Sequence, residues 1–234
     1  QAVSDKTCIG IVFYTGRHKS DQSDYSKPLT EDGTTIPDGD VHGYVVALTD
    51  VQNNDNDHLL WECGPNQEYN QKVGTSTDES NWQGYHNCLK IHEFVNNNAG
   101  WEMKHFPAAL ACETYGKRTL DKDGNTTTDY DWQKPLAAPS NSSGWFLPSL
   151  GQLKYLRGNS SLLSPRIDVV KNSLGNEYGY KDKIKWFGRN SYYYRSSTEY
   201  WLDSYSAWRV DLYYGYTGSW EKNKAYDVRA VLAF

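Results

Sequence analysis

Residues 207–213 have the sequence Ala207-Trp-Arg-Val-Asp-Leu-Tyr213, in which apolar and polar side chains alternate. Alternation with a period of two is typical of a β-strand with one buried face. We therefore expect one side of this strand to enter the core, with Trp208, Val210 and Leu212. The other side, continued by the following turn, should face outward with Arg209, Asp211, Tyr213, Tyr214 and Tyr216.

The segment around this strand, residues 188–226, is rich in tyrosine. Its 39 residues include nine Tyr, three Trp and six Ser, but no Phe, Met or Cys. A buried core favours Leu, Ile, Val and Phe instead. Tyr and Trp give rigid contact area in antibody-like binding surfaces, and Ser and Gly give adaptable hydrogen bonds. The composition predicts a ligand-binding surface, and the alternative is a set of ordinary aromatic pairs across strands.

The rest of the chain combines strands with helices. Apolar, β-branched runs predict strands, and apolar residues at three- and four-residue spacing predict helices. The expected strands are 7–14, 42–48, 59–63 and several from 183 to 234. The expected helices are 81–97, 108–115, 150–156 capped by Ser149, and 166–174. Strands at both ends with helices between them indicate an α+β fold whose terminal strands meet in one sheet.

Composition excludes several classes of protein. The 234 residues are enough for one large domain or two small ones, and the net charge is −5. We expect no nucleic-acid partner, because no Lys- or Arg-rich run could follow a phosphate backbone. We expect no transmembrane segment, since no apolar run approaches 18 residues. The first residues contain no recognisable signal peptide.

The four cysteines and the histidines give no strong metal signal. Cys8, Cys63, Cys88 and Cys112 are separated by 55, 25 and 24 residues, which matches no zinc motif. They are either buried thiols or one or two disulfides, with three possible full pairings. His86 and His92 are six residues apart, so on a helix they face different directions and are poorly placed to share a metal.

The best metal candidate is the stretch from residue 121 to 129. Its Asp and Asn residues have the alternate spacing of a calcium loop: Asp121, Asp123, Asn125 and Asp129. An EF-hand also needs Gly at position six and Glu at position twelve, where this chain has Thr126 and Trp132. A looser structural Ca²⁺ loop remains an alternative to a plain Asx-rich turn, and no other cofactor is expected.

Several short motifs resemble bacterial C-type lectin-fold domains, the superfamily that includes proteins similar to formylglycine-generating enzymes. The C-terminal motifs are Gly144-Trp-Phe-Leu-Pro-Ser-Leu150, Ser196-Ser-Thr-Glu199, Ala207-Trp208 and Val228-Arg-Ala-Val231. The N-terminal ones are Gly10-Ile-Val-Phe-Tyr14 and His42-Gly-Tyr-Val-Val-Ala-Leu48. The resemblance covers most of the chain and implies a single C-type lectin-like domain over residues 1–234.

Within that superfamily, the chain looks most like the variable proteins of bacterial or phage diversity-generating retroelements. Those proteins carry a mutagenised segment near the C-terminus, and adenine-directed mutagenesis of Asn codons yields chiefly Tyr, Ser, Asp and Asn. The resemblance implies that residues 188–226 are a variable ligand-binding segment. The implied ligand contacts are Tyr192, Tyr193, Tyr194, Arg195, Trp201, Asp203, Tyr205, Arg209, Asp211, Tyr213, Tyr214, Tyr216 and Trp220.

This interpretation predicts a secreted or surface-displayed adhesin or receptor-binding protein, located extracellularly, on the cell surface or on a phage tail. Its partner would be a protein or glycan on a cell surface, and it would be lipid-anchored or part of a larger surface or tail assembly. The alternative is a carbohydrate-binding domain with a fixed aromatic platform that stacks sugars on Trp201 or Trp220.

An enzyme is not expected. Formylglycine-generating enzymes use a cysteine pair near the C-terminus, whereas the last cysteine here is Cys112. The calcium-dependent sugar-binding tripeptides of animal C-type lectins are absent too, so a lectin-like fold would not by itself imply that activity.

Overall fold

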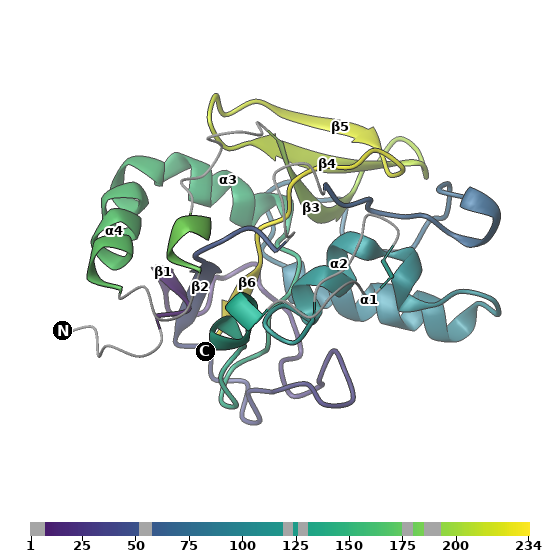
Figure 1. The fold of residues 1–234 in the computed structure, drawn as a ribbon. Coiled ribbons are helices and arrows are strands. Elements are labelled where there is room, and N and C mark those ends of the chain that lie inside the picture. Colours follow the sequence, from purple (N-terminus) through teal and green to yellow (C-terminus); the bar gives the residue numbers. More distant parts are fainter. Residues whose placement is uncertain (1–7, 52–57, 119–123, 126–130, 175–179, 185–192) are drawn as a thin grey trace.

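Figure 1 shows the fold of a computed structural model, which describes residues 8–51, 58–118, 124–125, 131–174, 180–184 and 193–234. The strands are β1 (Gly10–Thr15), β2 (Gly43–Ala47), β3 (Tyr193–Glu199), β4 (Ser206–Asp211), β5 (Thr217–Glu221) and β6 (Val231–Ala233). The α-helices are α1 (Gly84–Asn97), α2 (Pro107–Glu113), α3 (Leu150–Gly158) and α4 (Ser160–Ser173). The described residues therefore form an α+β fold, as the sequence predicts.

The first sheet joins the two ends of the chain. Its strand order is β1-β2-β6, and both neighbours run antiparallel to β2. Val46 of β2 lies opposite Ile11 of β1 and Val231 of β6, and all three side chains are buried. The expectation that the terminal strands share one sheet is confirmed.

The second sheet contains the tyrosine-rich segment. Its strand order is β3-β4-β5, with both pairs antiparallel. Figure 1 shows this sheet at the top of the molecule, with β5 at its outer edge and the helices below it. Residues 207–211 of the alternating sequence therefore lie in β4, the central strand of a three-stranded sheet, and Leu212 and Tyr213 begin the turn after it.

Helices α1 and α2 lie beneath β3 on one side (Figure 1). Cys88 and Ile91 are buried on α1, and Phe94 and Val95 pack partly against the same core, which confirms the predicted apolar face. Pro107 occupies the first turn of α2, where a missing N–H costs no hydrogen bond. All seven residues of α2 are buried, so this helix lies inside the fold.

Helix α3 begins as the sequence predicts. The Ser149 hydroxyl accepts a hydrogen bond from the Gln152 amide, and the Gln152 side chain accepts one from the Ser149 amide, forming a capping box. The Leu150 amide donates to the Thr198 hydroxyl at 3.0 Å, which ties the start of α3 to β3. The helix thereby supports the inner face of the tyrosine-rich sheet.

Helix α4 starts earlier than predicted, at Ser160 instead of Arg166, and contains Pro165. Proline removes one hydrogen bond from a helix interior. The helix nevertheless continues through it because Leu163, Ile167 and Val170 bury one side against the core. Within the described part of the chain, no helix is both long and apolar enough to cross a membrane.

The third predicted strand, 59–63, is wrong. Leu59 forms only an isolated antiparallel bridge with Tyr226. The next amides donate to different segments: Trp61 to the Lys222 carbonyl at 2.9 Å and Cys63 to the His105 carbonyl at 2.8 Å. The run is extended, as its sequence suggests, but its backbone partners change too quickly to form a ladder.

Candidate ligand-binding surface

The register of the second sheet separates an inward and an outward face. Tyr194 lies opposite Val210, and Arg195 lies opposite Arg209, which in turn lies opposite Gly218. The inward face buries Tyr194, Trp208 and Val210, and Leu212 follows them into the core. This confirms the predicted core positions of the central strand. The outward face carries the half-buried Tyr193 and Arg209 and the exposed Trp220.

The β4–β5 turn presents three tyrosines to solvent: Tyr213, Tyr214 and Tyr216 are 56%, 58% and 66% exposed. The buried Asp211 organises this turn, because its carboxylate accepts hydrogen bonds from the Tyr213 and Tyr214 amides at 2.8 and 2.7 Å. Gly215 has a φ of 87°, a conformation that favours glycine. The turn is therefore a fixed support for exposed rings.

The β3–β4 turn presents a second exposed apolar group at the other end of β4. It consists of Trp201, Leu202 and Tyr205. The Asp203 carboxylate accepts hydrogen bonds from the Tyr205 amide at 3.1 Å and from the Ser206 amide at 2.7 Å. Both ends of the central strand thus use an aspartate to hold the backbone beneath exposed aromatic residues.

An aromatic cage surrounds Arg209 on the outward face. The Arg209 Cζ lies 3.8 Å from the centre of the Tyr193 ring, 4.4 Å from Tyr226 and 4.6 Å from Trp220. A guanidinium within about 6 Å of a ring centre is attracted by the ring's electrons. The four side chains form one cluster, which is called the Arg209 cage below.

Arg195, which lies opposite Arg209 on β3, is fully buried and serves the scaffold. Its terminal nitrogens donate to the carbonyl groups of Ala207, Trp220, Glu221 and Lys224 at distances between 2.6 and 3.4 Å. Burial lowers the pKa of Arg195 to about 9, which leaves it a cation at neutral pH. The guanidinium fastens the segment after β5 to the sheet.

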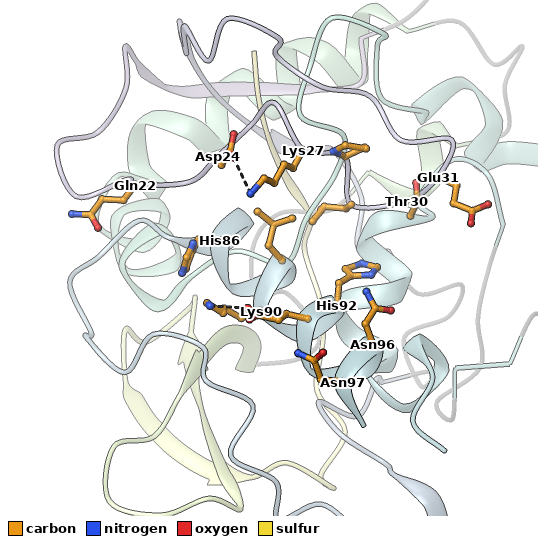
Figure 2. A pocket seen from close by; sticks show the side chains of 14 residues that line it. Gln22, Asp24, Lys27, Thr30, Glu31, His86, Lys90, His92, Asn96 and Asn97 are labelled. Atoms are coloured by element: carbon orange, nitrogen blue, oxygen red, sulfur yellow. Dashed lines mark hydrogen bonds and ion pairs between the residues drawn. The ribbon is translucent and has the colours of Figure 1, made fainter. Parts of the chain in front are cut away.

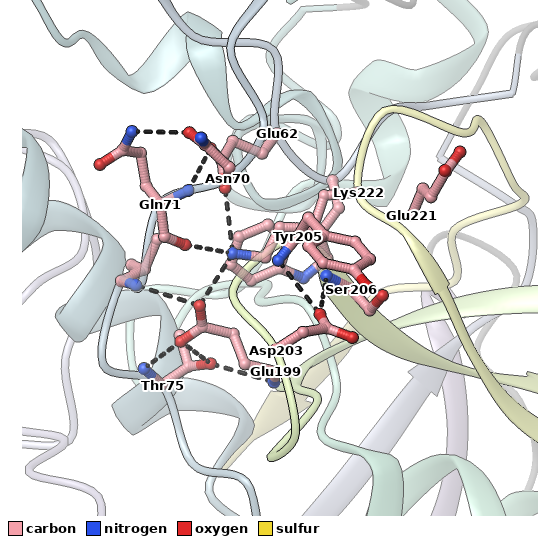
Figure 3. A network of polar contacts seen from close by, with 12 residues as sticks. Glu62, Asn70, Gln71, Thr75, Glu199, Asp203, Tyr205, Ser206, Glu221 and Lys222 are labelled. Carbon is pink, nitrogen blue, oxygen red and sulfur yellow. Dashed lines mark hydrogen bonds and ion pairs between the residues drawn. The ribbon is translucent and has the colours of Figure 1, made fainter.

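A buried charge network fixes the end of the sheet to the loop before α1 (Figure 3). The Lys222 ammonium lies 3.0 Å from a Glu62 oxygen and 2.8 Å from a Glu199 oxygen, and also donates to the Gln71 carbonyl. Glu199 accepts three further bonds from the amides of residues 73–75. Burial raises the pKa of Glu62 to about 7, against the opposing effect of Lys222.

A groove of about 470 Å³ opens beside this network. It is lined by Glu68, Tyr69, Asn70, Tyr205 and Glu221. Figure 3 shows the Tyr205 ring beside the Lys222 network, with Asn70 and Glu221 on different sides of it. Two tyrosine rings, two carboxylates and one amide can pack against and hydrogen-bond a polar ligand.

The predicted contact residues separate into three groups. Six are exposed: Trp201, Tyr205, Tyr213, Tyr214, Tyr216 and Trp220. Tyr193, Asp203 and Arg209 are half-buried, and Tyr192 lies outside the described residues. The prediction of a surface position is wrong for three residues, Tyr194, Arg195 and Asp211, which are at most 2% exposed. The Tyr194 phenol, the terminal nitrogens of Arg195 and the Asp211 carboxylate bond within the fold, so these three residues belong to the scaffold.

A second, larger groove lies between α1 and the loop at residues 22–31 (Figure 2). Figure 2 shows His86 and His92 standing apart along the helix. His92 contacts the buried Glu113 carboxylate at 3.0 Å. Burial opposes protonation of His92, but the Glu113 carboxylate outweighs it and raises the pKa of His92. Among the described residues, no cluster of three His, Cys, Asp or Glu side chains could hold a metal ion.

The cysteine and calcium predictions have different outcomes. Cys88 and Cys112 are buried, unbridged thiols and Cys8 is a half-buried one, which favours the thiol alternative over a disulfide framework. Burial raises the pKa of Cys88 and Cys112 well above the usual range. Of the calcium-loop candidates, Asp121, Asp123 and Asp129 lie outside the described residues, so the Ca²⁺ hypothesis stays a prediction.

Comparisons with known proteins identify a similar fold but no family. The sequence matches no family model and no curated protein. A solved structure of a fimbrial protein from Bacteroides ovatus superposes with a TM-score of 0.59 and 19% sequence identity. The match covers 100% of this chain and 46% of the fimbrial chain. The chain therefore spans less than half the length of that protein, and the likeness concerns the fold alone.

Proposed function

We propose that this chain is a non-catalytic ligand-binding protein of the cell surface, of the adhesin or receptor-binding type. The observation that carries the proposal is the exposure of six aromatic residues around one sheet. Trp201, Tyr205, Tyr213, Tyr214, Tyr216 and Trp220 are between 47% and 66% exposed. Grouped exposed aromatic residues are unusual on a surface without a partner, and Tyr and Trp are favoured in binding sites.

The rigidity of the support strengthens this proposal. Asp211 and Asp203 hold the two turns, while Arg195 and Lys222 hold the strands from below. A preformed surface loses little conformational entropy when it binds, so its contacts contribute more fully to affinity. The exposed rings are therefore suited to recognition without any rearrangement of the sheet.

The surface location is supported by the fold shared with a fimbrial protein. We further propose that the scaffold is a C-type lectin fold and that residues 188–226 are diversified by a retroelement. The genomic neighbourhood tests the second point directly. A reverse-transcriptase gene and a near-copy of this coding segment, differing at adenines, would support diversification, and an undiversified single copy would contradict it.

The proposal includes no thiol chemistry. Cys88 and Cys112 are fully buried, and burial raises the pKa of each thiol. A reactive cysteine needs an accessible thiolate. Neither residue meets that requirement, and both instead pack in the core near α1 and α2.

The groove beside Tyr205 favours a second candidate function, carbohydrate binding by a fixed aromatic platform. Sugars stack their apolar faces on aromatic rings and bond their hydroxyls to carboxylates and amides, and Tyr69, Tyr205, Glu68 and Asn70 supply those groups. Reproducible binding of one sugar class that depends on Tyr205, but not on the β4–β5 turn, would favour this candidate over the first.

A glycan array together with immobilised mucin and extracellular protein domains tests the binding proposal. We expect the chain to bind at least one probe, and expect the triple variant Tyr213→Ser, Tyr214→Ser, Tyr216→Ser to lose at least 90% of that signal. The matched control is Leu162→Ser with Val169→Ser, which removes exposed apolar side chains from α4 instead. Equal loss in both variants, or retained binding in the triple variant, would contradict the proposal.

A further inference from the structure

The guanidinium of Arg209 is held in place but has no anionic partner among the residues that the structure describes. Three rings surround it, from Tyr193, Trp220 and Tyr226. Within the described part of the chain, it makes no hydrogen bond or ion pair, and its buried Nε has no acceptor. The Nε is closed to solvent, so a carboxylate from outside the chain would bond to the terminal nitrogens of this half-buried side chain.

The charges around the cage also favour an anion. Arg195 lies directly across the strand pair from Arg209, and its Nε is also buried without an acceptor. The other nitrogens of Arg195 bond to neutral carbonyl groups. The nearby Asp211 carboxylate is engaged by the amides of the β4–β5 turn. Two guanidinium groups thus lie against the Tyr226 ring, and no carboxylate of the described residues bonds to either.

The surface next to Arg209 is open to a small ligand. Gly218 lies opposite Arg209 on β5, and a methyl group placed on Gly218 would meet no atom within 4 Å. Two residues along the same strand, Trp220 is 49% exposed. Side chains two apart on a strand point to the same face. The guanidinium and the indole therefore border one open space above Gly218.

We propose that the Arg209 cage is a subsite for an acidic sugar, in which Arg209 binds the sugar carboxylate and Trp220 stacks against the ring. Arginine is suited to this role because its planar fork binds a carboxylate through two parallel hydrogen bonds. The exposed indole beside an open glycine position favours a sugar ring over an extended peptide. The inference rests on the proposed ligand-binding function and specifies the ligand's chemistry.

The test compares acidic sugars with neutral sugars of the same shape. Ligand-observed NMR titration would use glucuronate against glucose, galacturonate against galactose, and N-acetylneuraminate against its methyl ester. We expect at least one acidic sugar to bind at least tenfold more tightly than its neutral counterpart, and its binding to weaken as NaCl is raised. The inference is overturned if no acidic sugar shows this preference.

Variants then assign the preference to Arg209. Arg209→Gln should abolish the preference, and Arg209→Lys should retain only part of it, because an ammonium cannot form the planar pair of bonds. Lys90→Gln, on α1, makes the same change of charge elsewhere and should leave the preference unchanged. Thermal unfolding of each variant confirms folding, and an unaltered preference in folded Arg209→Gln would overturn the assignment.

Two further outcomes separate this inference from the function on which it rests. A pentaglutamate peptide that binds more tightly than every acidic sugar, and loses binding in Arg209→Gln, would overturn the sugar assignment in favour of an acidic protein partner. If array binding depends on the β4–β5 tyrosines while acidic sugars show no preference, only this inference fails. If array binding is independent of those tyrosines, the proposed function fails whatever the sugar result.

Discussion

Raising the pH from 5 to 8 should destabilise this protein through Glu62, and replacing Glu62 with Gln should remove that part of the pH dependence. Glu62 and Glu199 share one buried lysine, Lys222. Among the described residues, Glu199 also accepts hydrogen bonds from three backbone amides, whereas Glu62 accepts one, from the Gln71 amide. The network therefore holds one surplus negative charge, and Glu62 is the carboxylate less supported by hydrogen bonds.

The sign and size of this pH effect on stability follow from the pKa of Glu62. Burial raises it from 4.5 in the unfolded chain to about 7 in the fold. Between these values the folded state binds more protons than the unfolded state, so stability is highest below pH 4.5 and falls as the pH rises through 7. The difference between the two pKa values corresponds to roughly 3 kcal/mol of unfolding free energy.

Urea unfolding, followed by tryptophan fluorescence at pH 5, 6, 7 and 8, measures this contribution. Burial lowers the pKa of His18, His86 and His105, and these groups change stability in the opposite direction over the same range. The informative quantity is therefore the difference between the wild type and Glu62→Gln in the slope of unfolding free energy against pH. Glu93→Gln is the matched control on the surface.

We expect the wild type to lose about 2–3 kcal/mol more than Glu62→Gln between pH 5 and pH 8. The control should keep the wild-type slope, because the exposed Glu93 has a lowered pKa and is ionised throughout this range. Equal slopes for the wild type and Glu62→Gln would refute the assignment of a raised pKa to Glu62.

Three further substitutions test the local supports of the surface, each by urea unfolding against the wild type. Asp211→Ala removes two charge-assisted bonds to turn amides and should cost about 2 kcal/mol; an unchanged midpoint would show that the turn does not need this carboxylate. Ser149→Ala removes the N-cap of α3 and should cost about 1 kcal/mol, a value that would be near zero if water replaced the hydroxyl. Gly215→Ala places a side chain at a φ of 87° and should cost about 1 kcal/mol, so a more stable variant would contradict the turn geometry.

Features determined by neighbouring residues were predictable from the sequence. The alternation around β4 correctly placed Trp208, Val210 and Leu212 in the core. Ser149 was recognisable as a cap because its partner, Gln152, is only three residues away. Both predictions depend on the geometry of one element, which the local sequence largely determines.

Features that depend on distant partners were not predictable. Arg195 bonds to carbonyl groups up to 29 residues away, and Lys222 pairs with Glu62 at a separation of 160 residues. Arg195 was expected at the surface as a ligand contact implied by the resemblance, and its neighbours in the sequence do not reveal the distant carbonyl groups that allow its burial. The predicted exposure of Asp211 was wrong for a related reason. Alternation predicts the face of the strand on which Asp211 lies, but not the hydrogen bonds that its carboxylate accepts from the amides of the next turn.

The central claim is that exposed and buried residues of the same segment have different roles, binding and support. The most direct test measures ligand affinity and unfolding free energy together in the triple variant Tyr213→Ser, Tyr214→Ser, Tyr216→Ser and in Asp211→Ala. We predict that the triple variant loses binding while its unfolding free energy falls by less than about 1 kcal/mol. The unfolding free energy of Asp211→Ala should fall by about 2 kcal/mol. A triple variant that binds as the wild type does but unfolds much more easily would contradict the account.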